Sequence, residues 1–260
     1  MFYKSIIYII LGVAVGVLSA ACAETGPAES PGRALTERRL ALVRQVERHV
    51  RETAPWLGRD TLDPRVIAAL KKTPRHEFVP PALLMWAYED RPLPIGADQT
   101  ISQPYIVAIM TDLLELDDDC NVLDIGTGSG YQAAILAELC NQVWSIEIVP
   151  SLGRAAAERL VRLGYTNIDV RIGDGFAGWP AKAPFDGIVV AAAGNELPPP
   201  LIEQLKPGGR IVMPVRDRSG GEMLVVGYKN PDGRISTTDI LPVRFVPLTR
   251  DPGSRINSAD

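Results

Sequence analysis

The stretch Val122-Leu123-Asp124-Ile125-Gly126-Thr127-Gly128-Ser129-Gly130 decides the fold of this chain. Residues 122–125, apolar apart from one acid, predict a buried strand, and residues 130–140 predict the helix that follows. Glycines between a strand and a helix let the backbone approach a ligand closely, because glycine lacks a Cβ and tolerates positive φ. The G-x-G-x-G spacing is one residue tighter than the dinucleotide-binding pattern, and no Lys-Ser/Thr pair follows to hold a triphosphate. An amino-acid nucleoside therefore fits this turn better than a pyrophosphate.

Two further acids follow strands of the same unit. Glu147 ends the expected strand 143–147, and Asp174 follows the expected strand 168–172. Ligands of an open parallel sheet lie outside the carboxyl ends of its strands, so Glu147 is placed to accept both ribose hydroxyls and Asp174 the adenine amino group. The predicted ligand is S-adenosylmethionine, and the alternative is that both acids are solvated loop residues. The predicted cofactor-binding residues are Asp124, Gly126, Thr127, Gly128, Gly130, Glu147, Asp174 and Gly175.

The order of helical and strand patterns predicts an α/β fold. Strands and helices alternate after residue 120, which implies a Rossmann-like parallel sheet with helices on both faces and late antiparallel strands. The expected strands are 122–125, 143–147, 168–172, 186–191, 210–215, 221–229 and 234–246, and the expected helices between them are 130–140, 151–163 and 198–205. An N-terminal helical region precedes the sheet, with helices at 36–52, 64–72 (capped by Asp63), 80–88 and 104–116. Residues 92–96 hold two prolines and are expected to lack regular structure.

The N-terminus has the pattern of an export signal. Lys4 precedes an apolar run over residues 6–21, and Cys22 follows small residues that resemble a lipoprotein box with its leucine one place early. We expect a periplasmic protein, which is either cleaved or tethered to a membrane, through lipid on Cys22 or through the retained apolar run. The alternative is a cytoplasmic enzyme with a mis-chosen start. The expected division is a signal segment 1–23, a linker 24–34, one domain 35–250 and a loose tail 251–260.

Composition narrows the classes of function. A net charge of −4 argues against nucleic-acid binding, and two histidines and three cysteines without close spacing argue against a metal site. Cys120 and Cys140 bracket the first strand and helix, whose antiparallel path brings them near each other. We expect two free thiols there, with a bridge in an oxidising periplasm as the alternative.

Beyond the glycine turn, four segments carry a family resemblance: residues 74–80, 99–105, 205–210 and 244–248. With them the chain, from about residue 40 to about residue 250, resembles the protein-L-isoaspartate (D-aspartate) O-methyltransferases, which use S-adenosylmethionine to repair proteins. The resemblance implies an enzyme that methylates the α-carboxyl of L-isoaspartyl, and also D-aspartyl, residues in damaged proteins and peptides. We expect it to be a monomer. The methyl ester then cyclises to a succinimide, whose hydrolysis restores some aspartate.

The acceptor chemistry suits this chain. A carboxylate of pKa roughly 4 is already ionised at neutral pH, so methyl transfer needs positioning of the reactants rather than a general base. The family's active-site serine maps onto Ser102, which precedes a helix N-terminus that favours anions. Its neighbours Thr100, Ile101 and Gln103 are the expected substrate-binding residues. The alternative for Ser102 is a helix cap.

Two other functions remain as alternatives. One is a methyltransferase of the same fold acting on a small molecule, against which the segment 99–105 counts. The other is a non-catalytic, membrane-tethered binding protein, which the retention of Ser102 and the three acids disfavours.

Overall fold

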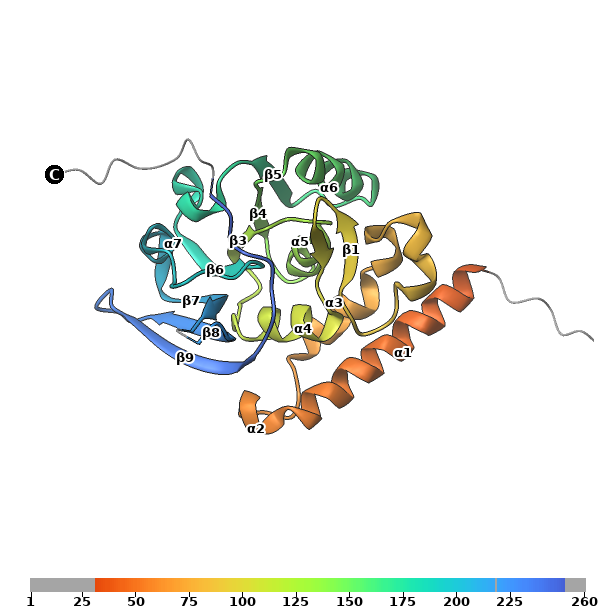
Figure 1. The fold of residues 1–260 in the computed structure, drawn as a ribbon, viewed down its shortest axis with the longest axis horizontal. Helices are drawn as coiled ribbons and strands as arrows, with labels where there is room; N and C mark the ends of the chain where they lie inside the picture. Colours follow the sequence, from red (N-terminus) through yellow and green to blue (C-terminus); the bar gives the residue numbers. More distant parts are fainter. Residues whose placement is uncertain (1–30, 218, 251–260) are drawn as a thin grey trace, which may run out of the picture.

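A seven-stranded sheet forms the centre of the molecule. The computed structural model describes residues 31–217 and 219–250, so the expected signal segment and tail lie outside the described residues. The strands are β3 (Asn121–Ile125), β4 (Gln142–Glu147), β5 (Ile168–Ile172), β6 (Phe185–Val190), β7 (Leu205–Arg216), β8 (Glu222–Lys229) and β9 (Ile235–Pro242). Their order across the sheet is β5-β4-β3-β6-β7-β8-β9 (Figure 1). The strands β5, β4, β3, β6 and β7 pair in parallel, and β8 and β9 pair antiparallel at one edge, which confirms the expected fold class.

Helices cover both faces of this sheet. The α-helices are α1 (Pro31–Glu52), α2 (Ala54–Leu57), α3 (Pro64–Lys72), α4 (Pro104–Asp112), α5 (Tyr131–Ala137), α6 (Pro150–Arg162) and α7 (Pro199–Gln204). Successive side chains of a strand point to opposite faces, so Val122 packs with α1, α3, α4 and α5 while Leu123 packs with Leu201 of α7. The sheet is thereby buried on both sides, as a parallel sheet requires.

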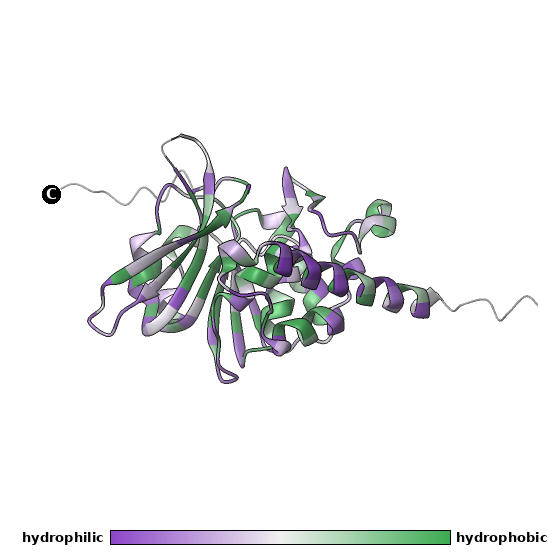
Figure 2. Ribbon diagram, turned by 90° about the horizontal axis from the view of Figure 1, so that it is seen from below, coloured by the Kyte–Doolittle hydropathy of each residue, from purple (hydrophilic) through white to green (hydrophobic). Residues whose placement is uncertain are grey.

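The long helix α1 is amphipathic. Val43, Val46 and Val50 are buried, as their spacing predicts, and Figure 2 shows hydrophilic residues along the helix. The helix begins at Pro31, so the last residues of the expected linker, 31–34, are helical. Among residues 31–217 and 219–250 no helix is both long and apolar enough to cross a membrane.

The segment 92–96 is regular, contrary to expectation. It contains the strand β1 (Leu93–Gly96), which pairs antiparallel with β2 (Gln99–Ile101) in a small separate sheet. Pro94 pairs with Thr100 in this ribbon. Proline is tolerated there because each strand of a two-stranded ribbon is an edge strand, and an edge strand can leave one N–H position unbonded. The prolines therefore did not exclude a strand.

Other element ends differ from the expected ones. The helix expected to reach residue 116 ends at Asp112, whose carboxylate accepts the N–H of Asp63 at 2.6 Å and pairs with Arg59 at 2.8 Å. Asp63 caps α3 as predicted, through a 2.8 Å bond from the N–H of Arg65. The expected helix 80–88 is a 3₁₀ segment, η2 (Pro81–Trp86), and the last strand ends at Pro242 rather than 246. The other 3₁₀ turns are η1 (Arg75–Phe78), η3 (Gly175–Ala177) and η4 (Pro180–Lys182).

Cys120 and Cys140 form a disulfide, so the expectation of two free thiols is wrong. Cys120 precedes β3 and Cys140 lies just beyond α5. Because α5 runs back along its strand, the two Cα atoms come within 4.7 Å of each other. This separation lies in the range that a disulfide requires. The bridge ties together the two ends of the unit that contains the glycine turn.

Candidate active site

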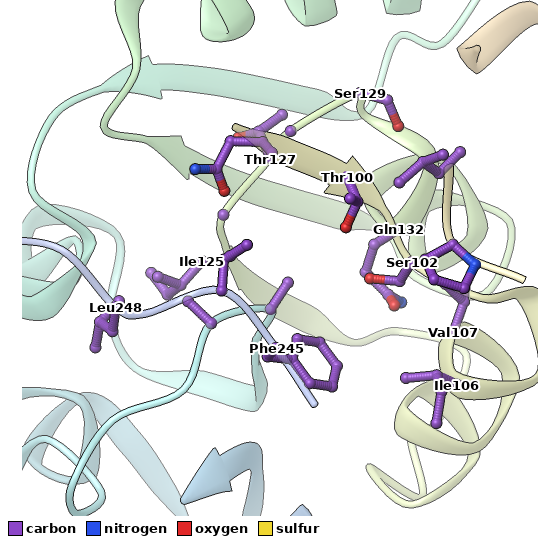
Figure 3. A pocket seen from close by; sticks show the side chains of 18 of the residues that line it. Thr100, Ser102, Ile106, Val107, Ile125, Thr127, Ser129, Gln132, Phe245 and Leu248 are labelled. Carbon is purple, nitrogen blue, oxygen red and sulfur yellow. The ribbon is translucent and has the colours of Figure 1, made fainter. Parts of the chain in front are cut away.

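A cavity of about 740 Å³ lies at the carboxyl ends of the parallel strands. It brings together most of the predicted site residues: Thr100, Ile101, Ser102, Gln103, Gly126, Thr127, Gly128, Glu147 and Gly175. Figure 3 shows Thr100 and Ser102, Thr127 and Ser129, and Phe245 and Leu248 around this one space. Three chain segments that are far apart in sequence thus share one cavity: the acceptor segment (residues 99–105), the glycine turn (residues 126–130) and the C-terminal strap (residues 242–249).

The glycine turn adopts a backbone that favours glycine. Gly128 has a φ of +53°, and its N–H donates to the Oε2 atom of Glu147 at 2.7 Å. Across the cavity wall, a Cβ on Gly175 would lie 2.4 Å from the Cγ2 of Ile125. A side chain is therefore disfavoured at Gly128 by its positive φ, and at Gly175 by the close packing of Ile125.

Glu147 is a buried carboxylate in the cavity wall, 4% exposed. Its Oε1 accepts the N–H of Val149 at 2.9 Å, while its Oε2 accepts that of Gly128. Each carboxylate oxygen can accept more than one hydrogen bond, so both retain capacity for hydroxyl donors such as those of a ribose.

Asp124 lies beneath the glycine turn rather than in the cavity wall. It is fully buried; its Oδ2 accepts the Ser145 hydroxyl at 2.7 Å, and Ser145 in turn accepts the Thr127 hydroxyl at 2.6 Å. The Oδ1 atom is buried without a hydrogen-bond partner. Burial raises the pKa of Asp124 to about 7, with the Ser145 hydrogen bond acting against this and the charge of Glu147 adding to it. A positive charge bound over the turn would favour the ionised form of this carboxylate, so the position of Asp124 is compatible with a cationic ligand in the cavity.

Asp174 and Gly130 also lie outside the cavity wall. Asp174 caps the turn η3 by accepting the Phe176 N–H at 2.9 Å, and its other oxygen pairs with Arg250 at 3.1 Å. Gly130 is the N-cap of α5, and a Cβ there would meet Leu160 at 3.3 Å. Each of the two residues therefore has a local structural role as a cap, and its contact with the cofactor stays a prediction.

The hydroxyl of Ser102 is not used as a helix cap. The N-cap residue of α4 is Gln103, and its side chain makes no capping hydrogen bond. The first free N–H, that of Tyr105, donates instead to Asp90 at 2.8 Å. Within the described residues the Ser102 hydroxyl makes no hydrogen bond, while Ser102 itself lines the cavity. This geometry leaves the hydroxyl available to a ligand.

The C-terminal strap is the part of the site that the sequence did not reveal. It runs back from β9 over the carboxyl ends of the strands (Figure 1) and lines the cavity. It is fixed by hydrogen bonds: Ala193 exchanges bonds with Val246 and Leu248 at 2.8 and 2.9 Å, and the N–H of Phe245 donates to Glu222 at 2.6 Å. In the sequence, residues 244–248 resemble the family, but this resemblance did not indicate that they would lie beside the cavity. Gln132 of α5 also lines the cavity and was not predicted.

Sheet order, glycine turn and buried acids together define an S-adenosylmethionine-dependent methyltransferase. Residues 58–253 match the family described as protein-L-isoaspartate(D-aspartate) O-methyltransferase. The chain belongs to this family.

Individual relatives agree with the family match. The chain is 54% identical to protein-L-isoaspartate O-methyltransferase 2 of Syntrophobacter fumaroxidans, over 88% of this chain and 92% of that one. It is 53% identical to protein-L-isoaspartate O-methyltransferase 1 of Cupriavidus necator, over 83% of each chain. Among solved structures, a protein-L-isoaspartate O-methyltransferase superposes with a TM-score of 0.71 at 28% identity, over 80% of this chain and 65% of that one. The same fold occurs in a Plasmodium falciparum protein described as a protein-L-isoaspartate O-methyltransferase, whose structure was solved with S-adenosyl-L-homocysteine. It superposes with a TM-score of 0.67 at 21% identity, over 81% of this chain and 98% of that one.

Proposed function

We propose that the cavity methylates the α-carboxyl group of L-isoaspartyl, and also D-aspartyl, residues in damaged proteins, with Ser102 binding the acceptor carboxylate. The observation that carries this assignment is that Ser102 lines the same cavity as the glycine turn, with its hydroxyl unused within the described residues. A small-molecule acceptor or a non-catalytic role is not favoured by the family match.

The cofactor end of the cavity fits S-adenosylmethionine. When bound, this cofactor supplies a methyl group activated by its sulfonium charge. Glu147 would accept hydrogen bonds from the ribose, since its two oxygens retain acceptor capacity. The buried carboxylate of Asp124 would favour the cationic ligand from beneath the turn. Both acids act by position and charge.

The acceptor end needs no base. An isoaspartyl carboxylate is ionised at neutral pH, because its pKa is roughly 4. Ser102 would donate its hydroxyl to that carboxylate and fix its direction, and Thr100, Ile101 and Gln103 would line the peptide. The strap lines the same space, so the two reactants would be held side by side within one cavity. One subunit supplies all of these residues, and we propose that the enzyme is a monomer.

We also propose that the enzyme works in the periplasm, free or tethered through Cys22. The support is the basic start, apolar run and small residues of the first 23 positions, with the polar linker that follows. The disulfide between Cys120 and Cys140 also supports it, since disulfides persist in oxidising compartments and are rare in the cytosol.

The role of Ser102 is tested by Ser102→Ala. We expect turnover on an isoaspartyl peptide to fall by about ten- to a hundredfold while affinity for S-adenosylhomocysteine is kept, because one hydrogen bond to a charged group is lost. Ser236→Ala on the exposed face of β9 is the matched control and should behave as wild type. Wild-type turnover of Ser102→Ala would remove Ser102 from the mechanism. An equal loss of cofactor affinity would place it in the cofactor site.

A further inference from the structure

The N-terminus of α4 is capped by a residue that lies well before it in the sequence, Asp90. Gln103 occupies the N-cap position without a side-chain cap, and Pro104, the next residue, has no N–H. The N–H of Tyr105 donates to the Oδ1 atom of Asp90, which lies in the loop before β1, at 2.8 Å. A carboxylate at this point complements the helix dipole as a local cap would.

The other oxygen of Asp90 binds two more side chains. Its Oδ2 accepts from Gln103 Nε2 at 3.2 Å and from His49 Nδ1 at 3.0 Å. The Asp90 side chain is only 1% exposed, so this carboxylate is removed from water and held by three donors. Two of the donors, Gln103 and Tyr105, follow Ser102 in the chain, and the third belongs to α1.

Helix α1 completes the arrangement. The His49 ring stacks on the Tyr105 ring with centroids 4.2 Å apart. The Tyr105 hydroxyl donates to Thr53 Oγ1 at 2.6 Å, since Thr53 uses its own proton on the His49 carbonyl at 2.8 Å. Both ends of Tyr105 are thereby fixed, its N–H by Asp90 and its hydroxyl by Thr53.

A buried cation also stands near Asp90. Arg75 is fully buried, donates to the Arg91 carbonyl at 3.3 Å and lies 4.9 Å from the centroid of the Tyr131 ring. Burial lowers the pKa of Arg75 to about 10, while the charges of Tyr131 and Asp90 act in the opposite direction. A nearby positive charge lowers the cost of burying a carboxylate such as that of Asp90.

We propose that Asp90 is a positioning residue for methyl transfer, which orients the Ser102 hydroxyl by fixing Gln103 and Tyr105 on the helix side of it. On the other side of Ser102, Ile101 is paired with Leu93 in the β1–β2 ribbon. Ser102 therefore lies between two anchored points, and only one of them depends on Asp90. His49 of α1 and Thr53, the residue just after α1, extend this support to a part of the chain that precedes the family match at residue 58. The inference rests on the proposed role of Ser102.

The test compares two buried aspartates at opposite ends of α4. Asp90→Asn keeps the size of the side chain but turns one acceptor oxygen into a donor that faces other donors. Asp112→Asn is the matched control, since Asp112 is 3% exposed, binds the Asp63 N–H and Arg59, and lies outside the cavity wall. We expect Asp90→Asn to lower kcat/KM for an isoaspartyl peptide by about tenfold or more with S-adenosylhomocysteine affinity kept, and Asp112→Asn to leave kcat/KM within about twofold. Similar losses of kcat/KM in the two variants would show general destabilisation and overturn the inference.

A double variant separates this inference from the role of Ser102. If Asp90 acts through Ser102, adding Asp90→Asn to Ser102→Ala costs little further activity, because the group to be positioned is gone. Independent, multiplying losses would overturn the inference while leaving the Ser102 assignment intact, and an active Ser102→Ala single variant would overturn that assignment first. If Asp90→Asn does not fold, His49→Phe, which keeps a ring on Tyr105 but removes the donor to Asp90, is judged by the same two comparisons.

Discussion

The backbone N–H of Gly128 donates to the carboxylate of Glu147 at 2.7 Å, which joins the glycine turn to the end of the neighbouring strand. The second oxygen of that carboxylate accepts the N–H of Val149. Glu147 therefore binds both the turn that follows β3 and the segment that follows β4. The same side chain lines the cavity. One residue thus shapes the turn and presents acceptor oxygens to the proposed ribose site.

Glu147→Gln should weaken S-adenosylhomocysteine binding by about ten- to a hundredfold, because a hydrogen bond to a charged group is worth about 1.5–3 kcal/mol. The amide keeps one oxygen for a backbone N–H but places a donor where the second acceptor was. Calorimetric titration gives the dissociation constant directly.

The matched control for Glu147→Gln is Asp186→Asn. Asp186 also accepts a backbone N–H, that of Asn121 at 2.8 Å, but at the amino edge of the sheet. The control should bind as wild type. Equal affinity of wild type and folded Glu147→Gln would disprove the ribose assignment.

The buried Asp124 predicts a pH dependence of stability. Burial raises its pKa to about 7, whereas an unfolded chain titrates near the ordinary value of 3.8. Between these two values the folded state binds more protons than the unfolded state, so the Asp124 contribution to the free energy of unfolding falls as pH rises through that window. Asp124→Asn cannot titrate and lacks this contribution.

Denaturant unfolding of the cofactor-free protein at both ends of the window measures this effect. The stability of wild type minus that of Asp124→Asn should be larger near pH 4 than above about pH 7. A difference that stays constant, or that grows as pH rises, would show that Asp124 is ionised throughout.

The disulfide predicts a redox-dependent stability. Closing a loop between residues 20 apart in sequence restricts the unfolded chain, so reduction should lower the free energy of unfolding by about 2–4 kcal/mol. Denaturant melts with and without a thiol reductant measure the change. The Cys120→Ala/Cys140→Ala double variant should show no response to reductant; if wild type shows none either, the bridge is absent in solution.

The native protein should begin near Cys22. The signal-like residues 4–22 predict either lipid on Cys22 or cleavage near it, and intact mass separates these two, because lipid adds hydrocarbon mass. Recovery from the cytosol with the first 23 residues still attached would contradict export.

The sequence predicted the central sheet well because its strands carry strong local patterns. The run 122–125 and the glycines after it are readable without tertiary information, and so is the cap of α3 at Asp63. The β1–β2 ribbon was missed because its pairing joins Pro94 to Thr100 across a turn, and the prolines dominate the local pattern.

The candidate site shows the same division. Residues at or just after strand ends, such as Glu147 and Gly175, were found because parallel strands share one carboxyl edge. The strap residues Phe245 and Leu248 reach the cavity only through long-range bonds to Glu222 and Ala193, which no sequence period signals. The disulfide was not expected because the spacing of two cysteines in the sequence does not show whether their thiols are oxidised.

The most direct test of the account is methyl transfer from labelled S-adenosylmethionine to an isoaspartyl peptide and to its aspartyl twin of the same sequence. We expect a methyl ester on the isoaspartyl peptide and background incorporation into the twin, with most of the activity lost in Ser102→Ala. Equal incorporation into both peptides, or none into either by folded protein that binds S-adenosylhomocysteine, would contradict it.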